Sequence, residues 1–330
     1  KTDFIYDHMI KDSMEHEDEE FFFIVPDQST LNAQKQLVTR HPRHGTFNID
    51  VVGFFRLTYR VFEELSHIPK DLLEDEGKSM VIRKIMEQHK EELKVFASSM
   101  KKQGFIDELK SFFAEVYQYD VSMEDLKKIT DGMKEEGLRS KMEDILLVME
   151  NFEDYIKERY LISEQLLDVL AQKVEQSEKL KNATFYLDGF TGFTPVQVNL
   201  LKTLFPMTDR VWAAVTLDKR VDPFCVTGMQ ELFHMSQKMV RTLLELADEA
   251  KCEVLEPIWV EDGRQYRYGN AKALLHLEEN LFRSSLKAYP KEQEEIQIQS
   301  CQNRKEELEF AAATISRMVR EEDYRYRDFA

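Results

Sequence analysis

The sequence lacks the features that define disulfide-rich and membrane proteins. Its 330 residues include three cysteines, Cys225, Cys252 and Cys301, which lie far apart and form no CxxC pair. Their spacing argues against a disulfide framework or a cysteine metal site and favours a reducing, cytoplasmic setting. No window approaches the ~18 uninterrupted apolar residues of a membrane-spanning helix, so we expect no membrane segment.

Positive charge is also scarce. The sequence has 45 Lys and Arg residues against 62 Asp and Glu residues, a formal net charge of −17 at pH 7. This balance argues against a protein that coats nucleic acid through general basicity. A local nucleic-acid groove stays open as an alternative, because net charge averages over all faces of a molecule.

A complete phosphate-binding loop is missing as well. Such a loop needs a glycine-rich turn that ends in Lys and Ser or Thr, and no internal GxxxxGK[ST] occurs. The sequence nevertheless opens with Lys1 and Thr2, followed by an apolar-periodic helix. This start looks like the middle of such a loop, although two residues alone are poor evidence for one.

Strands and helices alternate along much of the sequence. Short β-branched and aromatic runs predict strands at 21–26, 48–55, 183–190, 210–217, 252–260 and 295–301. Apolar residues at three- and four-residue spacing predict helices at 3–16, 30–39, 56–65, 195–205, 229–250, 271–283 and 305–322. Thr194 is the expected N-cap before Pro195 at the first helical position. This order predicts an α/β fold with a mainly parallel sheet.

Residues 70–181 differ from the rest. Helical periodicity runs through them with charged residues between the apolar ones, and no segment predicts a convincing strand. Ser122 and Asp125 have the spacing of a capping box. We therefore expect a large all-helical insertion between two strands.

Three loops follow predicted core strands, at 26–30, 53–56 and 188–191. In a parallel sheet they can converge on one rim, where ligands of such sheets bind. Together they offer amide, hydroxyl, guanidinium and aromatic groups, a mixture that suits single-stranded nucleic acid.

A purely structural interpretation of the same residues is open. Phe54 and Phe190 would then pack in the core, while Asp27 and Thr30 would cap a helix. Two segments that interleave Arg with Tyr, 263–270 and 324–329, also suit nucleic-acid contact, although solvated loops often have this composition.

Asp188 ends an apolar run, as does the carboxylate that holds Mg²⁺ through a water in P-loop NTPases. The next residue is Gly189, where a working ATPase of that kind carries a glutamate. The motif therefore predicts a metal-binding aspartate without the residue that orients the attacking water.

In their order, these stretches resemble the B-subunit family of the bacterial AddAB ATP-dependent helicase/deoxyribonucleases. The resemblance covers essentially the whole sequence and is carried by IVPDQSTLNAQ, VVGFFRLTYRVFEEL, FYLDGFTGFTPVQ and NRKEELEFAAATISRMVREEDYRYRDFA. The same stretches are similar, in degenerate form, to superfamily 1 helicase motifs. The resemblance implies a RecA-like helicase domain with a P-loop NTPase type of sheet.

The resemblance also implies domains and site residues. Residues 1–69 and 182–289 would form the first helicase-type domain, 70–181 its helical insertion, and 290–330 the start of a second such domain. Lys1, Thr2 and Asp188 would contribute to a truncated nucleotide site, with Asp188 holding Mg²⁺ through water. The residues at DNA-reading positions are Gln28, Thr30, Phe54, Arg56, Tyr59 and Phe190.

The function implied is participation in double-strand-break resection for recombinational repair. This segment would bind single-stranded DNA and read the Chi hotspot, hydrolysing ATP weakly or not at all, beside an A-type motor subunit in a heterodimer. The family's nuclease domain and iron–sulfur cluster would lie outside it, and no nuclease residue is expected here. An active ATP-driven translocase, or a scaffold that docks the motor subunit, are the alternatives.

Overall fold

The computed structural model describes residues 1–66, 71–218, 220–260, 268, 271–282 and 287–329. The chain divides into two compact units, residues 1–260 and 261–330. Each unit is described by itself below.

A four-stranded parallel sheet forms the centre of the first unit. Its strands are β1 (Phe21–Ile24), β2 (Ile49–Val52), β5 (Thr184–Asp188) and β6 (Arg210–Ala214), in the order β2-β1-β5-β6. Every pairing is parallel. Strands β1 and β5 are buried at every position, which explains the apolar run FFFI of β1 and the apolar centre FYL of β5. The predicted α/β fold with a parallel sheet is confirmed.

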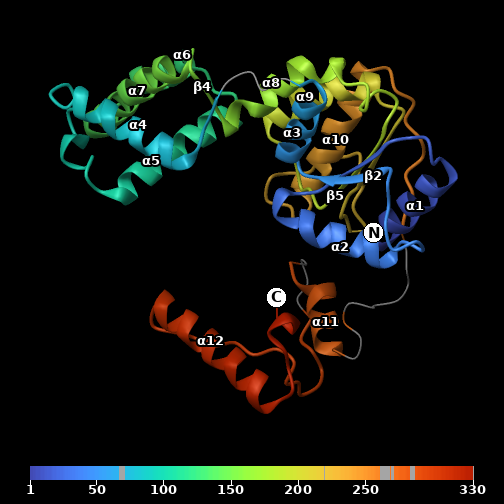
Figure 1. Cartoon of the computed structure of the whole chain (residues 1–330). Coiled ribbons are helices and arrows are strands. Elements are labelled where there is room, and N and C mark those ends of the chain that lie inside the picture. Colours follow the sequence, from blue (N-terminus) through green and yellow to red (C-terminus); the bar gives the residue numbers. More distant parts are fainter. Residues whose placement is uncertain (67–70, 219, 261–267, 269–270, 283–286, 330) are drawn as a thin grey trace. The chain divides into compact units, whose positions relative to one another are not determined.

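Helices cover both faces of this sheet (Figure 1). Helices α1 (Thr2–Glu15) and α2 (Thr30–Arg40) pack on one face against Phe21, Phe23 and Tyr186. The opposite face carries Phe22, Phe185 and Leu187 and packs against α3 (Phe54–Glu64), α8 (Leu166–Lys173), α9 (Pro195–Leu204) and α10 (His234–Glu249). Alternating side chains of each strand thus build two separate cores.

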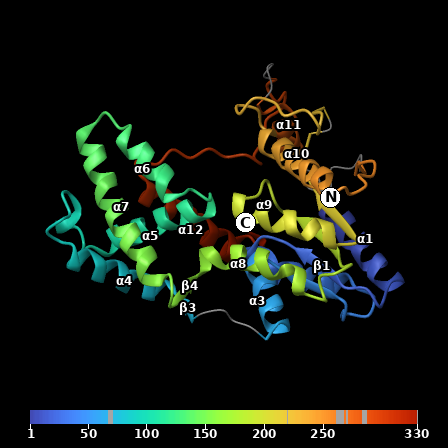
Figure 2. The same cartoon turned by 90° about the horizontal axis from the view of Figure 1, so that it is seen from above.

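Residues 71–162 form a helical insertion, with two differences from the expected all-helical segment 70–181. It ends earlier, because Leu167 and Leu170 of α8 pack in the core beside the sheet. Its helices are α4 (Asp75–Gln88), α5 (Gln103–Gln118), α6 (Met123–Asp131) and α7 (Glu136–Ile156), which share one core (Figure 2). Two short strands, β3 (Asp71–Leu73) and β4 (Tyr160–Ile162), pair in parallel at its base. The expectation of no strand there was wrong, because three-residue strands are too short to show a period in the sequence.

Both predicted helix caps are present. The Ser122 hydroxyl accepts a hydrogen bond from the Asp125 amide at 3.1 Å and begins α6. At α9 the side-chain oxygen of Gln197 accepts from the Thr194 amide at 3.0 Å, with Pro195 in the first helical position. These bonds satisfy amides that a helix start leaves free.

A buried ion pair fixes the start of the insertion to its end. Lys78 of α4 is 5% exposed, and its ammonium lies 2.9 Å from a carboxylate oxygen of Glu164 and 3.0 Å from the Ser163 hydroxyl. Glu164 lies in the 3-10 turn before α8, whose Leu167 and Leu170 belong to the core beside the sheet. The ammonium therefore joins the two chain segments that enter and leave the helical insertion.

Two predicted strands are absent from the described residues. Segments 252–260 and 295–301 have no regular structure, and most of their side chains are exposed. A strand needs a hydrogen-bonded neighbour, and neither segment has one among the residues that the structure describes. In the second unit, α11 (Lys272–Asn280) and α12 (Arg304–Glu321) confirm the two helices predicted there.

The tyrosine- and arginine-rich segments 263–270 and 324–329 were predicted either to contact nucleic acid or to be solvated loops, and the structure does not decide between the two. All of 263–270 except Tyr268 lies outside the described residues. In 324–329 the Tyr326 side chain is 70% exposed, while the Arg325 guanidinium pairs with Asp328 at 3.4 Å.

Among the described helices, none is long and apolar enough to cross a membrane.

Replacing Lys78 with Met should lower the free energy of unfolding by about 3 kcal/mol, because it leaves the Glu164 carboxylate buried and unpaired. The double change K78M with E164L should recover most of this loss. Lys128→Met, which removes an exposed pair with Glu124, should change stability by less than about 0.5 kcal/mol. Urea denaturation measures all three; equal effects of K78M and K128M would contradict the assignment.

Candidate nucleotide and nucleic-acid site

The register of the sheet brings the ends of its strands to one rim. Ile24 stands opposite Val52 on one side and Leu187 on the other, while Asp188 stands opposite Ala214. All four strands run in the same direction, so the loops that follow them begin at the same edge. The predicted convergence of the three loops at 26–30, 53–56 and 188–191 follows from this pairing.

Asp188 lies at this rim and is 5% exposed. The Lys1 ammonium donates to its carboxylate at 2.9 Å and to the carbonyl oxygen of Ala214 at 3.1 Å. Thr2 begins α1 directly after Lys1. The structure thus brings together Lys1 and Asp188, two of the three residues assigned to a nucleotide site, and sets them at the N-terminus of a helix.

These groups fit a magnesium-bound phosphate in their chemistry. A lysine ammonium and a helix N-terminus both favour phosphate oxygens, and a carboxylate at a strand end favours the hydration shell of Mg²⁺. Lys1 would hold the phosphate and Asp188 the metal's water. The bound metal would supply neutralisation of the phosphate charge.

Gly189 has a backbone that other residues adopt only with strain. Its φ is +84°, and a Cβ atom there would lie 3.1 Å from Cδ of Pro26. A glutamate at this position would combine a left-handed backbone with a crowded side chain. The close packing of the two rim loops therefore favours glycine over glutamate at position 189.

Gly53 makes a second close approach to the loop after β1. A Cβ atom on Gly53 would lie 2.0 Å from Oδ1 of Asp27 and 2.5 Å from its Cγ. Partial desolvation of this carboxylate raises the pKa of Asp27, and the charge of Arg56 opposes the rise. Residues 26 and 27 are thus held between glycines of the two neighbouring loops.

Three of the six predicted DNA-contacting residues are exposed at or beside the rim. Gln28 belongs to a short 3-10 helix (Asp27–Ser29), and Arg56 and Tyr59 lie on the solvent face of α3. Arg56 makes no ion pair within the part of the chain that the structure describes. Thr30 is half-buried, and its hydroxyl donates to the carbonyl oxygen of Asp27 at 3.0 Å.

The two predicted phenylalanines behave differently. Phe54 is 2% exposed and belongs to the core, so the expectation that its ring faces DNA was wrong, and the structural interpretation holds for it. Its ring centroid lies 5.6 Å from that of Phe190 and 6.3 Å from that of Phe193. Phe190 and Phe193 are only half-buried, with centroids 5.3 Å apart. Sequence reasoning missed Phe193, although it lies in the same loop.

Substituting Gly189 with Ala should lower the free energy of unfolding by about 1–2 kcal/mol, since an L-residue there keeps a left-handed backbone. Gly192→Ala is the matched control, because a Cβ there meets only Met235 Cε at an ordinary 3.6 Å. Chemical denaturation of both variants gives the comparison. If G189A were as stable as G192A, the loops would not be packed as described.

The sequence matches a known protein family over most of its length. The sequence profile of a family described as "ADDB, N-terminal" matches residues 1–278. A protein of Lachnoclostridium phytofermentans, named as the B subunit of an ATP-dependent helicase/deoxyribonuclease, is 37% identical over 99% of the chain. Proteins of the same name from Caldanaerobacter subterraneus and Geobacillus kaustophilus are each 32% identical, over 97% and 93% of the chain.

The matched region is one part of these relatives. The chain spans 29% of the Lachnoclostridium protein and 27% of the other two. The profile match covers most of the chain, and the identity holds across nearly all of it. The chain therefore belongs to the ADDB N-terminal family.

Proposed function

We propose that the chain is the RecA-like, helicase-type N-terminal module of a B subunit of an ATP-dependent helicase/deoxyribonuclease. In this role it binds single-stranded DNA and reads the Chi hotspot during double-strand-break resection for recombinational repair. The observation that carries the proposal is the rim itself. There Lys1 and Asp188 meet, and the loops with Gln28, Arg56 and Phe190 begin at the same edge.

The nucleotide part of the proposal concerns ATP with Mg²⁺. Lys1 would hold the phosphates and Asp188 a water of the metal. Gly189 offers no group to orient an attacking water, and its contact with Pro26 leaves little room for one. We therefore favour nucleotide binding with weak or no hydrolysis over an active translocase.

The DNA part depends on α3 and the two loops beside it. Arg56 and Tyr59 are three residues apart on the exposed face of the helix and can be reached together by one strand. An arginine guanidinium can bind a phosphate or a base edge, and an exposed tyrosine ring can stack on a base. Gln28 adds an amide, and Phe190 adds a half-exposed ring that Phe54 supports from below.

The relatives' name also describes a subunit, which supports a partner. We propose that this partner is an A-type motor subunit, that the assembly acts in the cytoplasm, and that the family's nuclease domain and iron–sulfur cluster lie beyond this segment. The motor subunit would then drive translocation, while the present segment guides and reads the strand.

Arg56→Ala in the complete two-subunit enzyme should weaken the response to the hotspot by roughly tenfold, because a bidentate Arg–base contact contributes about 1–3 kcal/mol. Arg60→Ala is the control: Arg60 lies on the same helix, but its guanidinium pairs with Asp50 at 2.8 Å. Hotspot-dependent protection of DNA from degradation is the measurement. An R56A enzyme with full hotspot response would refute DNA reading by this helix.

A further inference from the structure

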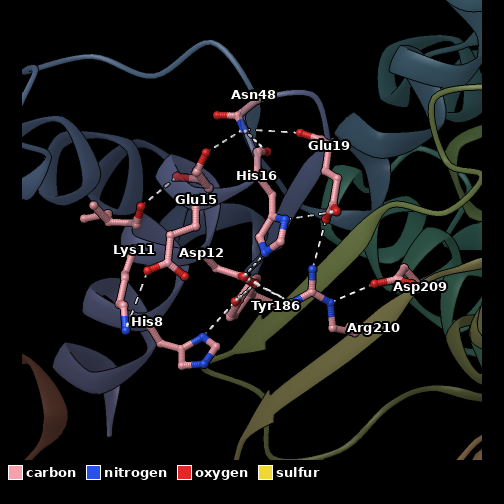
Figure 3. Close-up of polar contacts among 12 residues, drawn as sticks. His8, Lys11, Asp12, Glu15, His16, Glu19, Asn48, Tyr186, Asp209 and Arg210 are labelled. Atoms are coloured by element: carbon pink, nitrogen blue, oxygen red, sulfur yellow. Dashed lines mark hydrogen bonds and ion pairs between the residues drawn. The ribbon is translucent and has the colours of Figure 1, made fainter.

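A polar cluster lies beneath helix α1, away from the rim (Figure 3). Tyr186 of β5 is fully buried, and its hydroxyl donates to Oδ2 of Asp12 at 3.0 Å. Nδ1 of His8 lies 2.8 Å from the same hydroxyl. Since that hydroxyl's proton is directed at Asp12, His8 donates to the oxygen.

Arg210 completes the cluster from the start of β6. Its guanidinium contacts both carboxylate oxygens of Asp12 at 3.1 Å, Glu19 at 2.9 Å and Asp209 at 2.7 Å. The carboxylate of Asp12 is thus bound from β5 and from β6 at once. Within the described residues, the partners of this 8% exposed side chain lie on these two strands and at the C-terminal end of α1.

Two sets of contacts join α1 and its N-cap residue Lys1 to strand β5, one at each end of the helix. Lys1, His8 and Asp12 are separated by seven and four residues, which places them along one face of α1. Tyr186 and Asp188 are two residues apart and point to the same face of β5. Lys1 meets Asp188 at the same axial position of the helix at which His8 and Asp12 meet Tyr186, so one position satisfies both ends.

Apolar packing alone does not specify this position. Ile5, Met9 and Ile10 bury against the sheet, but such contacts are not directional and tolerate small shifts along the helix axis. Hydrogen bonds from buried groups tolerate them poorly, because a shifted helix would leave those groups unpaired. The cluster supplies the directional part of the contact between α1 and the sheet.

We propose that Tyr186 is a positioning residue for nucleotide binding: through His8 and Asp12 it sets the axial position of α1 and so holds Lys1 beside Asp188. This inference rests on the proposed function, because it names the nucleoside triphosphate site as what the cluster serves. Tyr186 itself is fully buried under the helix, so it acts through α1.

The test uses the intact protein, a fluorescent non-hydrolysable ATP analogue with Mg²⁺, and the variant Tyr186→Phe. The variant keeps the ring, stacked on Trp212 at 6.3 Å between centroids, and loses both hydrogen bonds. If the helix then holds its binding-competent position about one tenth of the time, the apparent affinity falls about tenfold. Amide exchange should become faster in α1 and stay unchanged in α2.

Tyr117→Phe is the matched control. Tyr117 also donates to a carboxylate, Glu153 at 3.4 Å, but within the helical insertion. Its loss should lower the melting temperature without changing nucleotide affinity. Should Y186F fail to fold, His8→Phe replaces it. Among the described residues, the one hydrogen bond of this half-buried side chain is that to Tyr186, and weaker analogue binding is again expected.

The outcomes separate the two proposals. If the unsubstituted protein binds the analogue and Y186F or H8F binds it equally well, the positioning role is refuted while the proposed function stands. If Y117F weakens binding as much as Y186F does, general destabilisation explains the effect and the positioning role is also refuted. If the unsubstituted protein binds no analogue, the nucleotide part of the proposed function fails, and this inference fails with it.

Discussion

The arrangement of the rim depends on two close approaches between loops. The loop after β1 lies against Gly189 on one side and Gly53 on the other, at distances that leave no room for a Cβ atom at position 53 and little at position 189. Parallel strands bring the loops to one edge, and these glycines let them touch. Asp188, Gln28 and Arg56 consequently stand on neighbouring segments of the rim.

The same packing supports the proposal of weak or absent ATP hydrolysis. A glutamate that orients water would have to stand where the backbone is left-handed and Pro26 is 3.1 Å away. The buried aspartate and its lysine partner remain, and they need no such room. Lys1 and Asp188 beside a position that cannot easily carry glutamate are what the proposed nucleotide binding with weak or no hydrolysis rests on.

Much of the fold could be predicted from the sequence. Continuous apolar runs such as FFFI indicated the buried strands, and helical spacing indicated the helices on both faces. The short strands β3 and β4 could not be predicted, because three residues are too few to show a period. Segments 252–260 and 295–301 were predicted as strands because a strand-like pattern does not reveal whether a neighbour is available.

The site was predicted only in part, because a residue's position along the chain does not show which way its side chain faces. Position along the chain placed Phe54 beside Arg56, but only the fold shows that its ring enters the core while Arg56 faces solvent.

The most direct test of the central claim is photo-crosslinking of single-stranded DNA to the intact protein, followed by mapping of the linked peptides. The account predicts links within residues 26–30, 54–59 and 189–193. Links confined to the helical insertion, residues 75–156, would contradict it.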